Sequence, residues 1–151
     1  MYLTYQEYLQ YGGTGGQSVY QKYEFDAEME VDRLTFTVDS VRKLEVAFPS
    51  GKDAEAVKRC MVAVIDRLSV LDDIDDDTAG NGLFSGRPVA SMSSGSESVS
   101  FMATSLDKAR TSEADRAAYM RSTIHRYLEG VQDANGVNLL YGGPYPCIVT
   151  Q

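Results

Sequence analysis

The chain has 151 residues, with 22 acidic and 14 basic side chains that give a formal net charge of −8. A chain of this length suits one domain whose core needs neither a metal nor a disulfide for support. The acidic balance argues against a protein that grips nucleic-acid phosphates, because such proteins carry basic patches. It does not exclude a protein past which DNA slides without sticking.

The cysteines and the hydropathy of the sequence further restrict the class of protein that is expected. Cys60 and Cys147 are the only cysteines; one falls on an apolar stripe and the other beside prolines, so a structural disulfide is not predicted. Two thiols in a chain of this size suit a reducing compartment. The sequence has no run of 18 apolar residues to span a membrane, and its first residues lack the basic and apolar regions of a signal peptide.

The first expected element is a short helix at residues 4–11. Thr4, followed three residues later by Glu7, forms the pattern of a capping box, in which each side chain bonds the backbone N–H of the other residue. Gly12 and Gly13 should end this helix, the first of them in a left-handed conformation.

A second helix is predicted at about residues 18–36, with an end as late as Ser40 left open, because apolar residues recur every three or four positions. Residues 34–38 also alternate in twos and are rich in β-branched side chains, which is typical of a strand. Residues 41–48 indicate one more helical piece, and residues 48–51 indicate a turn.

The chain is organised around a central helix expected at residues 53–74, because its apolar side chains recur at steps of four and three. These side chains are Val57, Met61, Val64, Leu68 and Leu71. Apolar residues widen the stripe on both sides, so we expect other helices to cover most of this helix.

An acidic run follows the central helix. It consists of Asp72, Asp73, Asp75, Asp76 and Asp77. Carboxylates at a helix C-terminus oppose the helix dipole, so we expect the acidic run to help end the helix. Residues 75–106 then form a predicted long connection, within which residues 88–102 alternate like a β-hairpin with a tip at 94–96. A lone hairpin is marginal in water and needs support, and a floppy surface loop is the alternative.

The last predicted helix covers residues 112–130. Ser112 and Asp115 resemble a capping box, and Gly130 lies near the expected end. Residues 131–151 contain Pro144 and Pro146, which cannot continue a helix, so an extended tail is expected there.

Together these patterns predict an all-α fold, a small bundle of about three to four helices with an inserted β-hairpin and an extended C-terminal tail. We expect a single domain over residues 1–151. Its parts are the N-terminal helix and glycine-rich turn at 1–16, core helices at 18–74, the loop with the hairpin at 75–106, a helix at 112–130 and the tail at 131–151.

The sequence contains no pattern that predicts catalysis or a bound cofactor. His125, the only histidine, has no nucleophile nearby in a recognisable local sequence. The glycine-rich residues 12–16 lack the following Lys-Ser/Thr and the preceding strand of a phosphate-binding loop. We therefore expect an assembly or binding protein rather than an enzyme.

A metal site is not expected either. The acidic run does not fit an EF-hand, because the twelfth position counted from Asp73 is Phe84 and the twelfth from Asp75 is Gly86, where a glutamate is needed. One histidine and two distant cysteines cannot form a zinc site of the usual spacing.

Four segments, none of them specific alone, together carry a resemblance to a known family. They are Leu3-Thr-Tyr-Gln-Glu-Tyr-Leu9 with Gly12-Gly13-Thr14, Ala56-Val-Lys-Arg-Cys-Met61 leading to Ile65-Asp66, Ser94-Gly-Ser-Glu-Ser-Val-Ser-Phe101, and Asn138-Leu-Leu-Tyr141-Gly. In this order, which spans almost the whole chain, they resemble the head–tail connector (adaptor) proteins of long-tailed bacteriophages. This chain departs from the family pattern in having the acidic run and Pro144-Tyr-Pro146, two features that the family does not require.

The resemblance implies an all-α core with a small hairpin and no catalysed reaction. It implies a ring of about twelve copies that assembles below the portal vertex after DNA packaging, extends the DNA channel and offers a platform to the next neck protein or the tail. The expected partners are other copies of the chain, the portal protein and a downstream neck stopper or tail protein, while DNA passes without specific binding. The expected location is the virion neck, after assembly in the bacterial host cytoplasm and without a membrane.

Three groups of residues are candidates for these contacts. The channel-lining candidates are the acidic run, since twelve copies at −8 each carry −96 formal charges, a field that keeps DNA from sticking. Residues 145–150 are expected to add a strand to an edge of the portal. The portal-docking candidates are Leu139, Leu140, Tyr141, Tyr145, Ile148 and Val149. The candidates for contacts between subunits are the hairpin residues Val89, Met92, Val99 and Phe101.

Two other readings remain open at this point. A tail-completion or other capsid-associated virion protein shares the composition but binds the other end of the neck. A soluble, non-catalytic interaction module can bind a partner through the tyrosine-rich N-terminal face, since the chain has ten tyrosines and no tryptophan.

Overall fold

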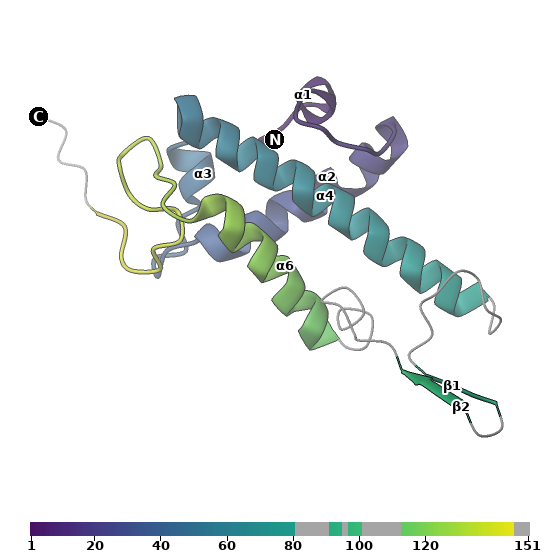
Figure 1. The fold of residues 1–151 in the computed structure, drawn as a ribbon. Coiled ribbons are helices and arrows are strands. Elements are labelled where there is room, and N and C mark those ends of the chain that lie inside the picture. The colour runs from purple at the N-terminus through teal and green to yellow at the C-terminus, as the bar shows by residue number, and fades with distance from the viewer. Residues whose placement is uncertain (81–90, 95–96, 101–112, 147–151) are drawn as a thin grey trace, which may run out of the picture. The chain divides into compact units, whose positions relative to one another are not determined.

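The computed structural model describes residues 1–80, 91–94, 97–100 and 113–146, with side chains placed at 1–73 and 113–146 (Figure 1). The chain divides into two compact units. The first unit comprises Met1–Ser69 with Met120–Gln151, and the second comprises Val70–Tyr119.

Helix α1 (Tyr5–Gln10) begins with the predicted capping box. The Glu7 N–H donates to Thr4 Oγ1 over 3.3 Å, and the Thr4 N–H donates to Glu7 Oε2 over 2.9 Å. Gly12 follows with φ of +91°, the left-handed conformation expected of it. Both local predictions for this helix are therefore confirmed.

Helix α2 (Gln17–Thr35) ends near the earlier of the two predicted limits, and α3 (Lys43–Val46) is the predicted helical piece after it. The chain leaves α2 at Phe36, which forms an isolated antiparallel bridge with Arg42. The Arg42 guanidinium lies over the Phe36 ring, 5.7 Å from its centroid. The alternation at residues 34–38 therefore marks a helix end and one bridge rather than a full strand.

Helix α4 (Gly51–Gly80) is the central element and is longer than predicted. Val57, Met61 and Val64 are fully buried, whereas Leu68 is half-buried. The helix continues through the acidic run, so the prediction that this run helps to end it, and that a loop begins at residue 75, is wrong. A charge at a helix C-terminus costs only about 0.3–1 kcal/mol, whereas each added residue gains a backbone hydrogen bond.

The described part of the second unit includes two short strands besides helical residues. Strands β1 (Ser91–Ser94) and β2 (Glu97–Ser100) pair antiparallel, with Met92 opposite Val99. They form a two-stranded sheet, which is marginal without support. The helices confirm the all-α class. That a β-hairpin is inserted in this fold stays a prediction.

Helix α6 (Glu113–Leu128) falls within the predicted range, and Gly130 follows it with φ of +78°. Ser112, the predicted cap, lies outside the described residues. The prediction of a wholly extended tail is wrong, because residues 131–141 turn back on themselves. Gln132 bridges to Asn138, and Leu139 is fully buried.

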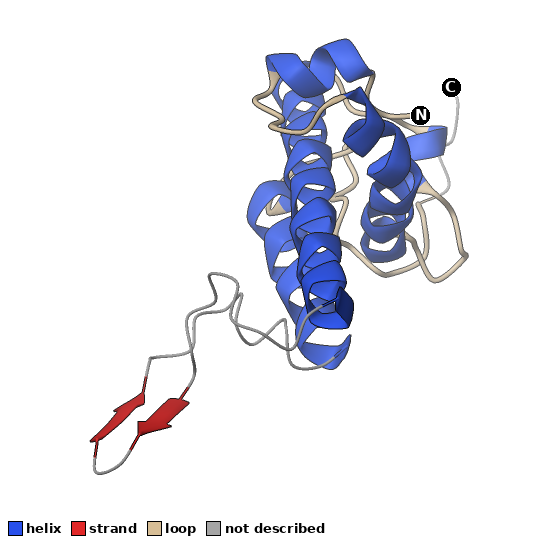
Figure 2. Ribbon diagram, turned by 90° about the vertical axis from the view of Figure 1, so that its right-hand side faces the viewer, coloured by secondary structure: helices blue, strands red, loops and turns tan. Residues whose placement is uncertain are grey.

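The core of the first unit combines aliphatic and tyrosine side chains from several helices, which lie side by side in Figure 2. Helix α6 contributes Ile124 and Leu128, both fully buried. Tyr5, Tyr8 and Tyr20 form a ring cluster with centroids 5.5–6.2 Å apart. The predicted burial of the central stripe therefore holds where it faces this core.

Candidate functional site

The C-terminal segment is held to the first unit by one buried lysine. Lys43, on α3, is fully buried, and its Nζ donates to the carbonyl oxygens of Asn138 (2.8 Å), Leu139 (3.0 Å) and Tyr141. Three acceptors match the three donors of an ammonium group. Burial lowers the pKa of Lys43, and the nearby Asp133 charge acts in the opposite direction. We call Lys43 and these three carbonyls the Lys43 anchor.

Asp133 shapes the turn that precedes the anchored residues. Its Oδ1 accepts the backbone N–H groups of Asn135 (2.8 Å) and Val137 (2.9 Å). Its own N–H donates to the Val137 carbonyl over 2.9 Å. Asp133 is almost fully buried, so these bonds supply the partners that a buried carboxylate needs.

The second oxygen of Asp133 holds Tyr145 in the tail. The Tyr145 hydroxyl donates to Asp133 Oδ2 over 2.7 Å and accepts from Asn135 Nδ2 over 2.7 Å. The Tyr145 N–H donates to Asp39 Oδ2 over 3.1 Å. Burial and the bond to Asp133 raise the pKa of the Tyr145 hydroxyl. We call Asp39, Asp133 and Asn135 the Tyr145 clip.

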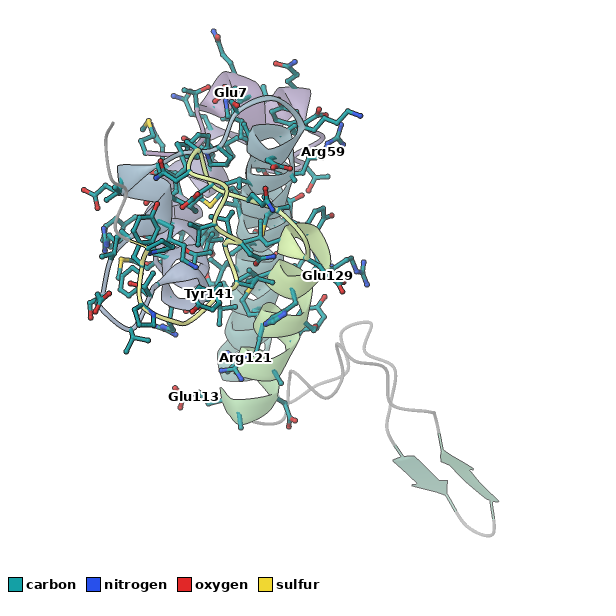
Figure 3. All side chains as sticks on the ribbon, turned by 90° about the vertical axis from the view of Figure 1, so that its left-hand side faces the viewer. Glu7, Arg59, Glu113, Arg121, Glu129 and Tyr141 are labelled. Carbon is teal, nitrogen blue, oxygen red and sulfur yellow. The ribbon has the colours of Figure 1, made fainter. Side chains whose placement is uncertain are left out.

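The candidate docking residues differ in how far they are buried. Leu139 is fully buried within its own chain, so its assignment to a docking surface is wrong for this conformation. Leu140 and Tyr145 are half-buried, and Tyr141 is 49% exposed (Figure 3). Ile148 and Val149 lie outside the described residues.

The other candidates are only partly described. Asp72 is half-buried and Asp73 is exposed, both on α4. Asp75, Asp76 and Asp77 are helical, but their side chains lie outside the described part. Met92 and Val99 are register partners in the ladder, while Val89 and Phe101 are outside the described residues.

The glycine-rich turn is a packing feature. The Tyr8 hydroxyl donates to Asp66 Oδ1 and accepts the Gly15 N–H over 2.8 Å. Burial and the bond to Asp66 raise the pKa of Tyr8 to about 12. A Cβ at Gly13 would overlap the Tyr8 ring, so the chain needs glycine there to pass the tyrosine closely.

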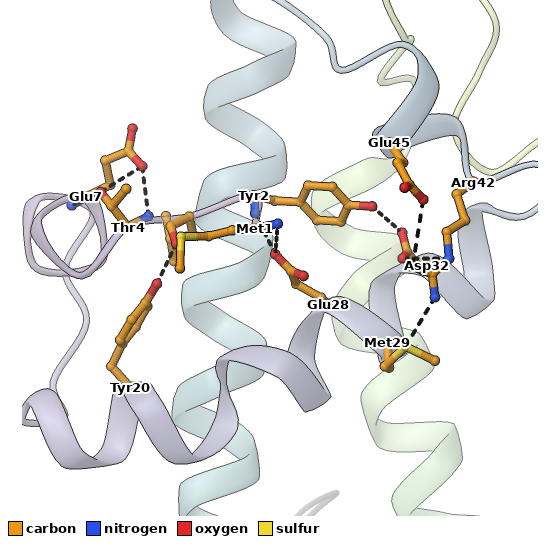
Figure 4. Close-up of polar contacts among 11 residues, drawn as sticks. Met1, Tyr2, Thr4, Glu7, Tyr20, Glu28, Met29, Asp32, Arg42 and Glu45 are labelled. Carbon is orange, nitrogen blue, oxygen red and sulfur yellow. Dashed lines mark hydrogen bonds and ion pairs between the residues drawn. The ribbon is translucent and has the colours of Figure 1, made fainter.

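A second polar cluster fastens the first residues to α2 (Figure 4). The Tyr2 hydroxyl donates to Asp32 Oδ1 over 3.0 Å, and Arg42 Nε lies 3.6 Å from Asp32 Oδ2. The Tyr2 N–H donates to Glu28, and the Tyr20 hydroxyl donates to the Leu3 carbonyl. Burial raises the pKa of Asp32, while the Tyr2 bond and Arg42 act in the opposite direction.

Cys60 and His125 are potentially reactive side chains within the described residues. Cys60 is buried, and burial raises its pKa to about 12, so its thiol stays protonated at neutral pH. His125 is exposed on α6. Within the described ranges, no three His, Cys, Asp or Glu side chains lie close enough to hold a metal ion. The same ranges contain no helix both long and apolar enough to cross a membrane.

One surface hollow of about 220 Å³ lies beside α1. Its lining comprises Met1, Tyr2, Leu3, Thr4, Glu7, Phe48 and Lys58. The two charged side chains in this lining, Glu7 and Lys58, form an ion pair with each other. The N-terminal ammonium of Met1, which also lines the hollow, pairs with Glu28 over 3.1 Å, so the charged groups of this lining already have partners.

The C-terminal segment depends on Lys43, Asp133 and Asp39, none of which was among the residues predicted from the sequence. The Asp-Ala-Asn-Gly sequence at 133–136 does carry turn residues and is a usable signal for the Asp133 turn. Lys43 has no such signal, because its partners lie about 95 residues away in the sequence.

Comparison of the chain with protein-family models, curated proteins and solved structures found no match.

Proposed function

We propose that this chain is a neck adaptor of a long-tailed bacteriophage. Copies of it form a ring under the portal, extend the DNA channel and provide the docking platform for the next neck protein or the tail. The chain acts by assembly and catalyses no reaction. The ordered resemblance described above is the basis of the proposal.

One observation supports it most directly: two of the resembling segments, far apart in sequence, contact each other through their own residues. Lys58 in the second segment pairs with Glu7 in the first. Asp66 accepts from Tyr8 and, over 3.3 Å, from Thr14. A chance likeness of scattered residues has no reason to gather them in one contact region, whereas a shared structural unit does.

The fourth segment adds to this support. Its residues Asn138, Leu139 and Tyr141 are the ones whose carbonyls bind Lys43. The last resembling segment is therefore held by Lys43, and the tail that follows it starts from a fixed position. This is the arrangement that a docking tail needs.

The remaining surfaces take roles within the proposal. The acidic run lines the channel or its rim, where negative charge repels passing DNA. The hairpin contacts a neighbouring subunit or the downstream neck protein, which would give a marginal two-stranded ladder the support it needs. The exposed tail residues dock on the portal.

The test is the mass of the complex that the chain forms with the portal protein of the same phage, measured by light scattering on a sizing column. We expect one copy of the chain per portal subunit. The absence of binding, with the portal ring intact and the chain folded by circular dichroism, would overturn the proposal. A monomer measured in isolation would not, because a ring of this kind can require its template.

A further inference from the structure

The tail after the Lys43 anchor is held in a different way from the residues before it. The anchor uses a fully buried ammonium and ends at Tyr141. Beyond it, Tyr145 is half-buried between Pro144 and Pro146, which are both exposed. Two of its three clip partners, Asp39 and Asn135, are exposed as well.

Two glycines separate the anchor from the Tyr145 clip. Gly142 and Gly143 can adopt a wide range of backbone angles at little steric cost. Gly142 is exposed, and a Cβ there would meet no other atom within 4 Å, whereas Gly143 lies close to the Tyr141 side chain. The residues beyond them can therefore swing away without disturbing the three carbonyls bound by Lys43.

We propose that residues 144–146 form a releasable strap, closed by the Tyr145 clip in the free chain, and that closure competes with docking of the tail on its partner. This inference rests on the proposed function and adds a regulatory step to it. Docking that uses Tyr145 must first break its bonds to Asp39, Asp133 and Asn135. The partner surface that fits the released strap must then supply oxygen acceptors for the Tyr145 N–H and hydroxyl, such as main-chain carbonyls at a sheet edge or a carboxylate.

The strength of the clip suits a switch. It consists of three hydrogen bonds at a partly exposed position, two of them to the carboxylates of Asp39 and Asp133. Roughly a tenfold change in the closed-to-open ratio is therefore expected for each carboxylate bond lost. A chain that is competent to dock only when open binds its partner more weakly by the open fraction. Weakening the clip should therefore raise the apparent affinity by a similar factor.

The sequence of the strap provides a clean reporter. Pro144 and Pro146 have no backbone N–H, so Tyr145 carries the only exchangeable amide between Gly143 and Cys147. That amide is the one bound to Asp39. Its hydrogen exchange, followed by NMR in the full-length chain, reports whether the bond to Asp39 is formed. In Tyr145→Phe, which keeps that acceptor, faster exchange reports opening of the strap.

The decisive variant is Asp39→Ala, which weakens the clip without altering the tail. We expect the Tyr145 amide to exchange roughly tenfold faster, and the portal to bind roughly tenfold more tightly in titrations followed by fluorescence anisotropy. Asp39→Asn keeps an oxygen acceptor but loses the charge, so both effects should be smaller than those of Asp39→Ala. Asp26→Ala removes an exposed carboxylate elsewhere, on α2, and is the matched control.

Each arm can overturn the inference. Unchanged exchange in both Asp39→Ala and Tyr145→Phe would show that the clip does not hold the strap. Faster exchange with unchanged portal affinity would show that closure does not compete with docking. If the wild type and every variant fail to bind the portal, the proposed function falls, while the exchange experiment on the free chain still decides whether the strap is held.

Discussion

The N-terminal and C-terminal segments are attached to the first unit in different ways. At the N-terminal end, the hold is spread over the Glu7–Lys58 pair, the bond of Tyr8 to Asp66 and the bond of Tyr2 to Asp32. At the C-terminal end, it is concentrated in Lys43, which serves three carbonyls at once. Loss of a single side chain should therefore matter far more at the C-terminal end.

Lys43→Met tests this difference between the two ends most strongly. It keeps the length and apolar stem of the side chain but removes the buried cation. Three carbonyls, that of Leu139 buried and those of Asn138 and Tyr141 partly buried, lose their donor, and Asp133 loses a nearby positive charge. We therefore expect a loss of about 3 kcal/mol or more in the free energy of unfolding. Urea denaturation measures it.

Lys52→Met is the matched control for this substitution, because Lys52 is exposed near the start of α4. Its effect should stay within about 0.5 kcal/mol. If Lys43→Met costs no more than Lys52→Met, the C-terminal segment is held by its apolar contacts, Leu139 above all, and not by the anchor.

The same contrast explains which parts of the fold the sequence predicts. The capping box at Thr4 and the left-handed Gly12 were predictable, because both depend on residues within one or two turns of the chain. The Lys43 anchor joins residues about 95 positions apart, and no local pattern encodes that meeting. The fold class and the helix positions follow from periodicity, whereas the C-terminal contacts do not.

The end of α4 shows a different kind of failure. The acidic run was expected to oppose the helix dipole and stop the helix, and the sign of that effect is right. Its size is too small, because helix propagation adds a backbone bond at every residue through to Gly80. The end of α4 was therefore predicted wrongly, because the prediction used the sign of the dipole effect and not its magnitude.

The second substitution tests whether the several contacts of the N-terminal segment can compensate for the loss of one. Gly13→Ala should cost about 1–3 kcal/mol in the free energy of unfolding, because the new Cβ would overlap the Tyr8 ring. The ring cannot move aside freely, since its hydroxyl is bonded to Asp66 and to the Gly15 N–H. Thermal denaturation and urea titration both report the loss.

Gly142→Ala serves as the comparison, because a Cβ at that exposed glycine meets nothing within 4 Å. It should change the free energy of unfolding by less than about 0.5 kcal/mol. Equal effects of the two substitutions would mean that the turn moves away from Tyr8, and that the close passage at Gly13 does not contribute to stability.

The smallest expected effect concerns Asp32, which accepts the Tyr2 hydroxyl and so helps to hold the N-terminal residues on α2. Burial raises its pKa above the ordinary value of 3.8, against the opposing influence of Tyr2 and Arg42. Between those two pKa values the folded chain holds more protons than the unfolded chain, so stability from this group is present below the ordinary pKa and is lost as pH rises through the raised one.

Asp32→Asn removes the titration while keeping an oxygen that can accept from Tyr2. The free energy of unfolding of the wild type, minus that of this variant, should therefore fall as pH rises from about 3.5 to about 7 in urea titrations. The nearby carboxylates of Glu28 and Glu45 are present in both proteins, so their direct contributions largely cancel in the difference. A difference that rises with pH would mean that the Tyr2 bond and Arg42 outweigh burial, and that the junction at Asp32 is held by its charge.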